Sequence, residues 1–564
     1  MINKLYTSRS EGDISWSDYP RPSLVRDRWM SLNGEWSFMA KSSRDKVYYS
    51  GKIRVPYCPE SELSGVGEVF RQGRFIYKRS FMIPREWEGM RLLLHFGAVD
   101  AIARVYVNGT FTGEHRGGYT AFTYDITDVA EEFNDLEVRV IDELDRNYPY
   151  GKQRYERGGM WYTPVSGIWQ SVWLEAVPKE YVRSIKQKTL EKGVKLYFEG
   201  GGDGSIKLES GEEYPVRDGH ATVEPGELRM WSPKDPFLYR YSARIGEDEF
   251  SSYFAIRSIE IRQCGEYKRT YLNGGPVYFH ALLDQGYYPE GIYTPPSSAS
   301  FEDDIKTAKA LGFNTLRKHV KVEPDVFYYL CDVYGMLVFQ DMVNNGSYSY
   351  VFDTLAPTVG MKKRLKRLEK RDVKAGRIFL HEMDATATQL MFHPCIVMWT
   401  IFNEGWGQVR ADDMYDHLRK LDSERLIDTT SGWFRENKSD IESYHVYFHR
   451  PWIKRTDKVC MISEFGGYAI KTEGHVFNDK SYGYKMYSDP ESFSKGFFEL
   501  YERDILPLIE KGVCCDVYTQ LCDVEDEING LVTYDRRVVK LPEDRAKELG
   551  RRLDERYLKV CEES

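Results

Sequence analysis

Two glutamates, Glu404 and Glu464, each come directly after a short run of apolar residues. The first run, CIVMWTIFN, occupies positions 395–403, and the second, CMIS, occupies positions 460–463. Runs of this kind are typical of strands that are buried on both faces in a parallel sheet. A carboxylate at the end of a buried strand is costly to desolvate unless it faces a cavity or has partners. The alternative for each acid is a structural role, such as capping the next helix.

Two such acids are what a retaining glycosidase needs. One carboxylic acid protonates the leaving oxygen, and the other carboxylate attacks the anomeric carbon. The two carboxyl groups then lie about 5–5.5 Å apart. The sequence therefore predicts that Glu404 and Glu464 meet across one cleft.

The elements that would position these acids begin near residue 259, where apolar strands start to alternate with helices. This alternation is typical of a (β/α)8 barrel, whose catalytic groups lie at the carboxyl ends of the strands. One helix is predicted at 300–311, with Ser300 and Asp303 at capping-box spacing, and another at 324–334, with Gly335 as its stop. Three more helices are predicted at 375–391, 411–421 and 491–511. The eight predicted strands are 277–283, 314–318, 336–340, 395–403, 426–430, 441–444, 460–463 and 516–519.

The first part of the chain has a different pattern, with many short strands and no helices between them. This pattern is typical of a jelly roll or sandwich. Asn108-Gly109, between two strand-like runs, is a strong hairpin signal. A second β unit follows, and its length suits an immunoglobulin-like sandwich. The predicted domains are therefore a jelly roll at 1–178, an immunoglobulin-like β-sandwich at 179–258, and a TIM barrel at 259–564.

Composition excludes several classes of protein. The chain has 564 residues, which is too many for one core, and a net charge of −9 with no strongly basic half, which argues against nucleic-acid binding. The first ten residues hold no apolar signal segment and no run reaches membrane-spanning length, so we expect a cytoplasmic protein with no membrane partner. The nine scattered cysteines are predicted to be buried free thiols, and without C-x-x-C spacing no metal site is expected.

Several motifs, in this order and spacing, resemble those of glycoside hydrolase family 2, the group that holds β-galactosidases, β-glucuronidases and β-mannosidases. The resemblance implies a sugar-binding-type jelly roll, an immunoglobulin-like domain and a catalytic barrel. It also implies Glu404 as the general acid/base, Glu464 as the nucleophile, a glycoside or oligosaccharide substrate, and no cofactor. Whether the chain forms a homo-oligomer is left open. The motifs are YPRP at 19–22, LNGEW at 32–36, YTPVSGIWQ at 162–170, the junction at 254–261, NE at 403–404 and SEFGG at 463–467.

The polar residues at the predicted strand ends supply the other candidate site residues. Asn403 is expected to donate to the sugar 2-hydroxyl, and Arg317 to orient Glu464. The alternatives are a turn Asn and a buried Arg–carboxylate pair. His319 is a candidate for a sugar hydroxyl or for a core histidine, and Asp284 and Asp341 are candidates for sugar hydroxyls or for helix caps. The remaining candidates are His445 and Tyr447 after the sixth strand, Trp406 and Trp433 as stacking platforms or core residues, and Gln520 with Asp523 at the site floor.

The chain departs from the family pattern in ways that leave the sugar open. Arg317-Lys318-His319 is one residue shorter than the family's Arg-Thr-Ser-His, and Gln340-Asp341 stands where an Asp-Glu pair is common. Neither the Asn-x-Lys element that reads a glucuronate carboxylate nor the Glu-x-His magnesium pair is evident, since Asn437-Lys438 precedes Glu464.

The sequence thus predicts a retaining, exo-acting hydrolase of β-glycosidic bonds that works by double displacement and is β-galactosidase-like. The alternatives are β-glucuronidase, β-mannosidase or α-L-arabinopyranosidase specificity, or a non-catalytic carbohydrate-binding protein on the same scaffold. The insertion at 346–374, basic at 362–367, is interpreted as a solvated loop, with a lid over an acidic substrate as the alternative.

Overall fold

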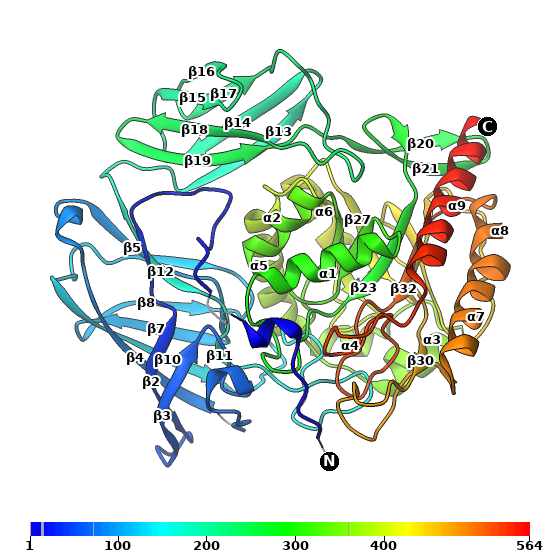
Figure 1. Ribbon diagram of the computed structural model, residues 1–564, viewed down its shortest axis with the longest axis horizontal. Coiled ribbons are helices and arrows are strands. Elements are labelled where there is room, and N and C mark those ends of the chain that lie inside the picture. The colour runs from blue at the N-terminus through cyan, green and yellow to red at the C-terminus, as the bar shows by residue number, and fades with distance from the viewer. Residues whose placement is uncertain (1, 13–15, 72, 359, 564) are drawn as a thin grey trace.

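The computed structural model describes residues 2–12, 16–71, 73–358 and 360–563. The chain forms two β-domains and a barrel (Figure 1). The N-terminal β-domain is drawn in blue to cyan, the second β-domain lies above it, and the barrel with its helices fills the other side of the molecule. Among the described residues, no helix is both long enough and apolar enough to cross a membrane.

The N-terminal β-domain consists of two main antiparallel sheets that enclose one apolar core. Asn108 and Gly109 have φ values of 50° and 77° and turn the chain between β7 (Ile102–Val107) and β8 (Thr110–Arg116), which confirms the predicted hairpin. The six-stranded sheet is β3 (Val47–Val55), β2 (Gly34–Lys41), β4 (Gly73–Met82), β10 (Phe133–Asp142), β7 (Ile102–Val107) and β8 (Thr110–Arg116). The four-stranded sheet is β1 (Trp29–Ser31), β12 (Val172–Val177), β5 (Arg91–Phe96) and β9 (Phe122–Asp125).

The second β-domain is a smaller sandwich of two sheets. Val194, Leu196 and Phe198 occupy every second position of one strand, and their side chains point into the core of this domain, as their spacing predicts. One sheet is β13 (Ser184–Leu190), β14 (Gly193–Glu199) and β17 (His220–Val223). The other is β16 (Glu213–Val216), β15 (Gly204–Leu208), β18 (Tyr239–Ile245) and β19 (Asp248–Phe254).

A buried ionic cluster ties the two β-domains together. Arg26 pairs with Glu175 of β12 at 3.0 Å and with Asp248 of β19 at 2.7 Å. Tyr19 and Arg21, from the YPRP motif, also donate to Glu175. Since each charge has a partner of opposite sign, the cost of burying them is offset and the domains are held in a fixed relation.

The barrel contains eight parallel strands, one at each of the eight predicted positions. The hydrogen-bonded order starts at β27 and ends at β28, and no backbone pairing joins these two strands in the described part of the chain. Ser431 Oγ of β27 and Ser443 Oγ of β28 lie 3.3 Å apart and bridge the gap. In sheet order the strands are β27 (Leu426–Ser431), β26 (Ile396–Asn403), β25 (Leu337–Asp341), β24 (Thr315–Lys318), β23 (Phe279–Asp284), β32 (Val513–Thr519), β29 (Val459–Gly466) and β28 (Ile441–Val446).

Helices surround the barrel, and two of the predicted details are wrong. The first helix begins at Ala299 after Ser298, so Ser300 lies inside it and forms no capping box. The predicted helix at 491–511 is interrupted by a wider π-type turn, Tyr501–Ile505, next to Pro507, which has no N–H to donate. Gly335, with φ of 68°, ends its helix as predicted. The helices are α1 (Ala299–Ala310), α2 (Asp325–Tyr334), α5 (Val373–Leu390), α6 (Ala411–Leu421), α7 (Pro490–Leu500), α8 (Leu506–Ile509) and α9 (Glu543–Glu562).

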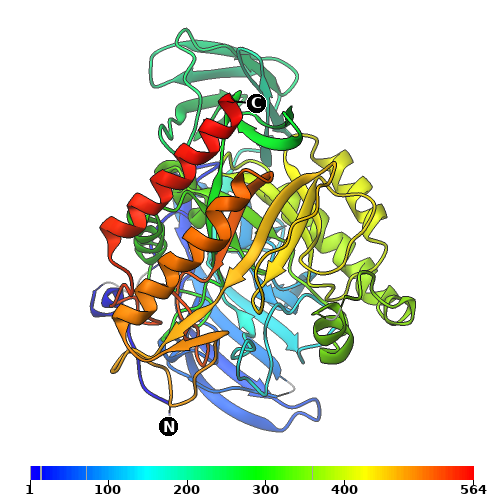
Figure 2. The ribbon, with the colours of Figure 1, turned by 90° about the vertical axis from the view of Figure 1, so that its right-hand side faces the viewer.

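The C-terminal helix α9 was not predicted. It lies beside α7 and α8 across the outside of the barrel (Figure 2). Its apolar residues Leu549, Leu553 and Tyr557 form one stripe that faces the core, while charged residues cover the rest. All nine cysteines are free, and all but Cys561 are buried, which confirms the expected thiols.

The insertion at 346–374 is more ordered than a solvated loop. It forms a π-type turn (Tyr350–Leu355) and two short helices, α3 (Ala356–Thr358) and α4 (Lys366–Arg371). Arg364 is fully buried and pairs with Asp353 at 3.2 Å and Asp372 at 2.9 Å. Its neighbours Lys362 and Lys363 are exposed, so one basic residue anchors the insertion and the others face solvent.

Candidate active site

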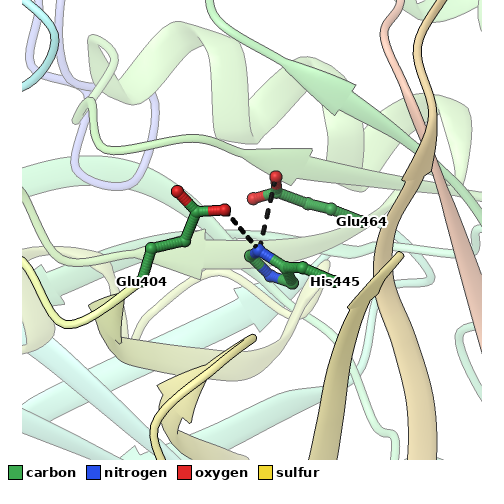
Figure 3. Close-up of side chains that lie close together, drawn as sticks. All are labelled: Glu404, His445 and Glu464. Carbon is green, nitrogen blue, oxygen red and sulfur yellow. Dashed lines mark hydrogen bonds and ion pairs between the residues drawn. The ribbon is translucent and has the colours of Figure 1, made fainter. Parts of the chain in front are cut away.

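Glu404 and Glu464 meet at the carboxyl ends of two barrel strands that are separated by β27 and β28. Glu404 follows β26 and Glu464 lies near the end of β29. One carboxylate oxygen of each acid, together with a ring nitrogen of His445, lie within 4.8 Å of one another (Figure 3). This separation suits a retaining glycosidase, because an inverting one needs about 6.5–9.5 Å to admit a water molecule.

A strained turn aims Glu404 across the barrel mouth. Its φ is 51°, in the left-handed region that non-glycine residues rarely adopt. The backbone N–H of Glu404 donates to Ser431 O at 3.0 Å, which holds the turn against β27. A Cβ on the next residue, Gly405, would lie 2.3 Å from the ring of Phe434, so only glycine fits there. Strain of this kind is stored mainly at functional sites.

Three side chains surround the carboxylate of Glu464. Arg317 donates to its Oε1 at 3.1 Å, and the hydroxyl of Tyr447 donates to its Oε2 at 2.6 Å. Burial alone raises the pKa of Glu464, but the positive charges of His445 and Arg317 outweigh burial and lower this pKa to about 2. Glu464 is therefore ionised at neutral pH, as a nucleophile must be.

Arg317 is the centre of the network. It pairs with Asp341 at 3.0 Å and donates to the backbone carbonyl of Ser463 at 2.9 Å. It also donates to Asn403 Oδ1 at 2.9 Å, which leaves the amide nitrogen of Asn403 without an acceptor among the described residues. The guanidinium of Arg317 thus holds the nucleophile Glu464 in place. Because it binds Oδ1 of Asn403, the amide nitrogen of Asn403 points away from Arg317.

We expect Arg317→Met to lower the free energy of unfolding by about 3–5 kcal/mol, because Asp341 and Glu464 would be left buried without their cation. Arg317 is only 1% exposed, so solvent cannot take its place. Urea unfolding followed by tryptophan fluorescence measures the change. Arg85→Met, at a side chain that is 90% exposed, is the control and should change little. Equal stability of the two variants would contradict the role of Arg317.

His445 lies beneath both glutamates. Its side chain is fully buried, and its Nδ1 is 2.8 Å from Glu404 Oε1 and 3.5 Å from Glu464 Oε2 (Figure 3). Its other ring nitrogen lies 3.1 Å from Ser431 Oγ. Nδ1 is therefore hydrogen-bonded to Glu404 and lies within ion-pair distance of Glu464. Trp433, half-buried, stands beside His445 with ring centroids 6.2 Å apart.

His319 completes the network through Asp341. Its Nδ1 lies 2.8 Å from Asp341 Oδ2, and the residue is buried. Burial first, and then the positive charge of Lys152, lower the pKa of His319 to about 4. The ring is therefore neutral in the folded protein at pH values where an unfolded histidine gains a proton.

This pKa predicts that His319 destabilises the fold in mild acid. As pH falls from 6.5 to 4, the unfolded chain takes up a proton at His319 and the folded chain does not, so stability falls by about 3 kcal/mol. The difference in unfolding free energy between wild type and His319→Gln should shrink by about that amount over this range. Urea titrations at half-unit pH steps test it, with the exposed His417→Gln as control. Parallel curves for wild type and His319→Gln would contradict it.

The other predicted site residues have partners outside this network. Asp284 accepts from Lys318 at 2.6 Å, Gln520 donates to Asn529 at 2.8 Å, and Asp523 pairs with Lys540 at 2.6 Å. Trp406 is fully buried, and its ring stacks on Trp161 at 5.0 Å. The structure thus brings these residues into one contact network: Glu404, Glu464, Asn403, Arg317, His319, Asp341, Tyr447 and His445.

Two residues near the site were not predicted from the sequence. Tyr484 stacks on Tyr447 at 3.7 Å between ring centroids and fixes the direction of its hydroxyl. Lys152 comes from the N-terminal β-domain, and its charge lowers the pKa of both His319 and Glu464. Neither residue stands at the end of a barrel strand. The other site residues were predicted from that position, so the sequence held no indication of Lys152 or Tyr484.

Comparison with known proteins finds matches to one family over two parts of the chain. The description "Glycosyl hydrolases family 2, sugar binding domain" matches residues 68–178, and "Glycosyl hydrolases family 2, TIM barrel domain" matches residues 296–538. A β-galactosidase of Thermoanaerobacter pseudethanolicus is 22% identical over 80% of this chain, which spans 62% of that protein's length. A β-glucuronidase of Felis catus is 22% identical over 80% of this chain and 74% of its own.

Solved structures share the fold. A β-glucuronidase of an uncultured Clostridium species superposes with a TM-score of 0.73 at 19% identity, covering 96% of this chain and 100% of its own. A β-galacturonidase of Eisenbergiella tayi, bound to galacturonate, has a TM-score of 0.68 at 18% identity, covering 94% and 99%. Both matched domains carry the same family description, and together they span more than half of this chain. The chain therefore belongs to glycoside hydrolase family 2.

Proposed function

We propose that the protein hydrolyses β-glycosides from the non-reducing end with retention of configuration. The observation that carries the proposal is the pair of carboxylates within 4.8 Å on facing strands of the barrel. The relatives include proteins named β-galactosidase and proteins named β-glucuronidase. The proposed substrate is therefore a β-linked hexoside or hexuronide. The β-galactosidase-like activity that the sequence predicts is tested below with a β-galactoside.

In the first step, a carboxylate oxygen of Glu464 forms a bond to the anomeric carbon as the bond to the leaving oxygen breaks. The proton of Glu404 passes to that oxygen, so the aglycone departs as a neutral alcohol. Asn403, with its amide nitrogen free, donates to the sugar 2-hydroxyl. The product is a glycosyl ester on Glu464, and Glu404 is left as a carboxylate.

In the second step, the Glu404 carboxylate takes a proton from water as the water oxygen attacks the anomeric carbon. The ester bond breaks, and Glu464 leaves as a carboxylate. Arg317 and Tyr447, which donate to its two oxygens in the free protein, stabilise this charge as it returns. Two inversions at one carbon give net retention.

A metal-centred hydrolase is a second candidate, because Glu404, His445 and Glu464 have the spacing of a metal-binding cluster. The contacts of Glu464 argue against it. Both of its oxygens already accept from cationic or hydroxyl donors, and the Arg317 guanidinium, 3.1 Å away, would repel a metal cation. Activity that is lost with EDTA and restored by a divalent metal would favour this candidate.

The test is a panel of para-nitrophenyl β- and α-glycosides, with the first-formed anomer read by NMR in deuterated water. The proposal expects turnover of β-glycosides only and the β-anomer as the first product. The α-anomer first would indicate inversion and contradict the mechanism. Sugar binding without any turnover would instead support a non-catalytic carbohydrate-binding protein.

A further inference from the structure

Lys152 differs from the other buried lysines of this protein. Four lysines are buried among the described residues, and Lys152 is 8% exposed. Lys318 pairs with Asp284 at 2.6 Å, Lys321 with Glu323 at 2.8 Å, and Lys540 with Asp523 at 2.6 Å. No carboxylate of the described chain lies within ion-pair distance of Lys152, whose nearest aromatic contact is the ring of Tyr162, 5.9 Å from Nζ. A buried ammonium without a counter-ion is costly, so an anion that binds there gains affinity by supplying one.

The backbone on either side of Lys152 is fixed to the mouth of the barrel. The N–H groups of Tyr150 and Gly151 donate to Asn344 O at 3.0 and 3.4 Å, and Asn344 Nδ2 donates to Gly151 O at 3.2 Å. Asn344 follows β25. A Cβ at Gly151 would lie 3.0 Å from the carbonyl of Val320, the residue after His319. Lys152 is therefore held against the carboxyl ends of β24 and β25, where the catalytic network lies.

The charge of Lys152 acts inside this network. After burial, it is the largest cause that lowers the pKa of His319, and it also lowers the pKa of Glu464. His319 uses Nδ1 for Asp341, and its other ring nitrogen has no hydrogen-bond partner among the described residues, so it can serve a ligand. The charge of Lys152 thus acts on both His319 and the nucleophile.

We propose that Lys152 determines specificity by binding an anionic group, a carboxylate or a sulfate, on the sugar ring held above Glu464. This inference rests on the proposed function. A carboxylate or sulfate oxygen supplies the counter-charge that no described carboxylate supplies within ion-pair distance, and a charge-assisted hydrogen bond is roughly twice as strong as a neutral one. A hydroxyl in the same place would leave the ammonium uncompensated. The alternative is that Lys152 serves only to keep Glu464 ionised.

Kinetics on matched charged and neutral substrates separate these roles. The para-nitrophenyl β-glucuronide and β-galacturonide are compared with the β-glucoside and β-galactoside, and a 6-sulfated β-galactoside tests the sulfate arm. The variants are Lys152→Met, Lys152→Arg and, as a control, Lys179→Met at an exposed position in the segment that follows β12. Lys152→Met should lower kcat/KM for the anionic substrates by about 100-fold, mainly through KM, and change the neutral ones by less than about threefold. Lys152→Arg should retain part of the preference.

Two results would overturn the inference. One is a wild-type protein that prefers the neutral substrates. The other is a Lys152→Met variant that loses kcat equally on charged and neutral substrates while the acid limb of its pH profile moves upward, which would assign Lys152 to the ionisation of Glu464. Preference for uronides over the sulfated sugar, or the reverse, identifies the anion.

Failure of the proposed function can be told apart from failure of this inference. If no glycoside is hydrolysed, the melting temperature is measured with free D-glucuronate, D-galacturonate, galactose 6-sulfate and galactose. Stabilisation by an anionic sugar in the wild type, but not in Lys152→Met, would support the anion site even though the hydrolase proposal had failed. Absence of stabilisation by all of the anionic sugars would overturn it.

Discussion

We expect Glu464→Ala to lower kcat on aryl β-glycosides by about 10⁵-fold, because the covalent intermediate cannot form without this carboxylate. The variant should still fold, since Arg317 keeps Asp341 as its counter-ion at 3.0 Å. Steady-state kinetics with para-nitrophenyl substrates, backed by a circular dichroism spectrum, measure the loss. Glu473→Ala, at an exposed acid nine residues further along, is the control and should retain full activity.

Azide gives this prediction a second readout. The alanine leaves space beside the anomeric carbon, and azide that enters there should attack from the side that Glu464 had occupied. The product expected is the α-glycosyl azide, which NMR distinguishes from the β form. Retention of more than a hundredth of wild-type turnover in Glu464→Ala, without azide, would exclude Glu464 as the nucleophile.

The second large effect is expected for Glu404→Ala, and its size should depend on the leaving group. A phenyl glycoside needs protonation and should lose about 10³- to 10⁴-fold in kcat/KM, whereas a dinitrophenyl glycoside, which leaves readily as an anion, should lose far less. Azide should here raise kcat and yield the β-glycosyl azide, because it attacks the glycosyl ester from the side that Glu404 faces.

Glu404→Gln is the matched variant for this position, since its amide can still contact His445, which lies 2.8 Å from Glu404 Oε1 in the native protein. It keeps the packing and removes the acid, so it should show the same dependence on leaving group as Glu404→Ala. Equal losses on phenyl and dinitrophenyl glycosides in both variants would show that Glu404 supports structure rather than proton transfer.

Most of the barrel strands could be predicted from the sequence because they are short runs that are buried on both faces, whereas β28 is buried on alternate residues along most of its length. Glu404 and Glu464 follow such runs, and strands of one parallel sheet must end at the same face, so their meeting was predictable from position alone. The separation of their oxygens, within 4.8 Å, is close to the predicted value.

Other elements had weaker signals. β3 is exposed along most of its length, so it lacks the alternation by which strands are recognised. α9 is densely charged outside its narrow apolar stripe. The expected capping box at Ser300 failed because Ser298 lies at the helix start. Sequence spacing cannot show which of two nearby serines the chain places at a helix end.

Contacts between domains could not be predicted at all. Lys152 reaches the barrel because its loop binds Asn344, and Asn344 is distant in sequence. Asp284, Gln520 and Trp406 stand at the positions where site residues were expected, yet Asp284 pairs with Lys318, Gln520 donates to Asn529, and the ring of Trp406 stacks on Trp161. Position at a strand end indicates which side chains can reach the mouth, and only packing decides which of them still have free donors or acceptors.

The gap between β27 and β28 bears on how the two acids are spaced. Glu404 is anchored to β27 through Ser431, whereas His445 and Glu464 belong to β28 and β29. Hydroxyl contacts among Ser431, Ser443 and Ser463, with Asp428 behind them, replace main-chain bonds at this seam. The spacing of the two acids therefore depends on side-chain hydroxyl groups at this seam, whereas the other neighbouring barrel strands are joined by main-chain hydrogen bonds.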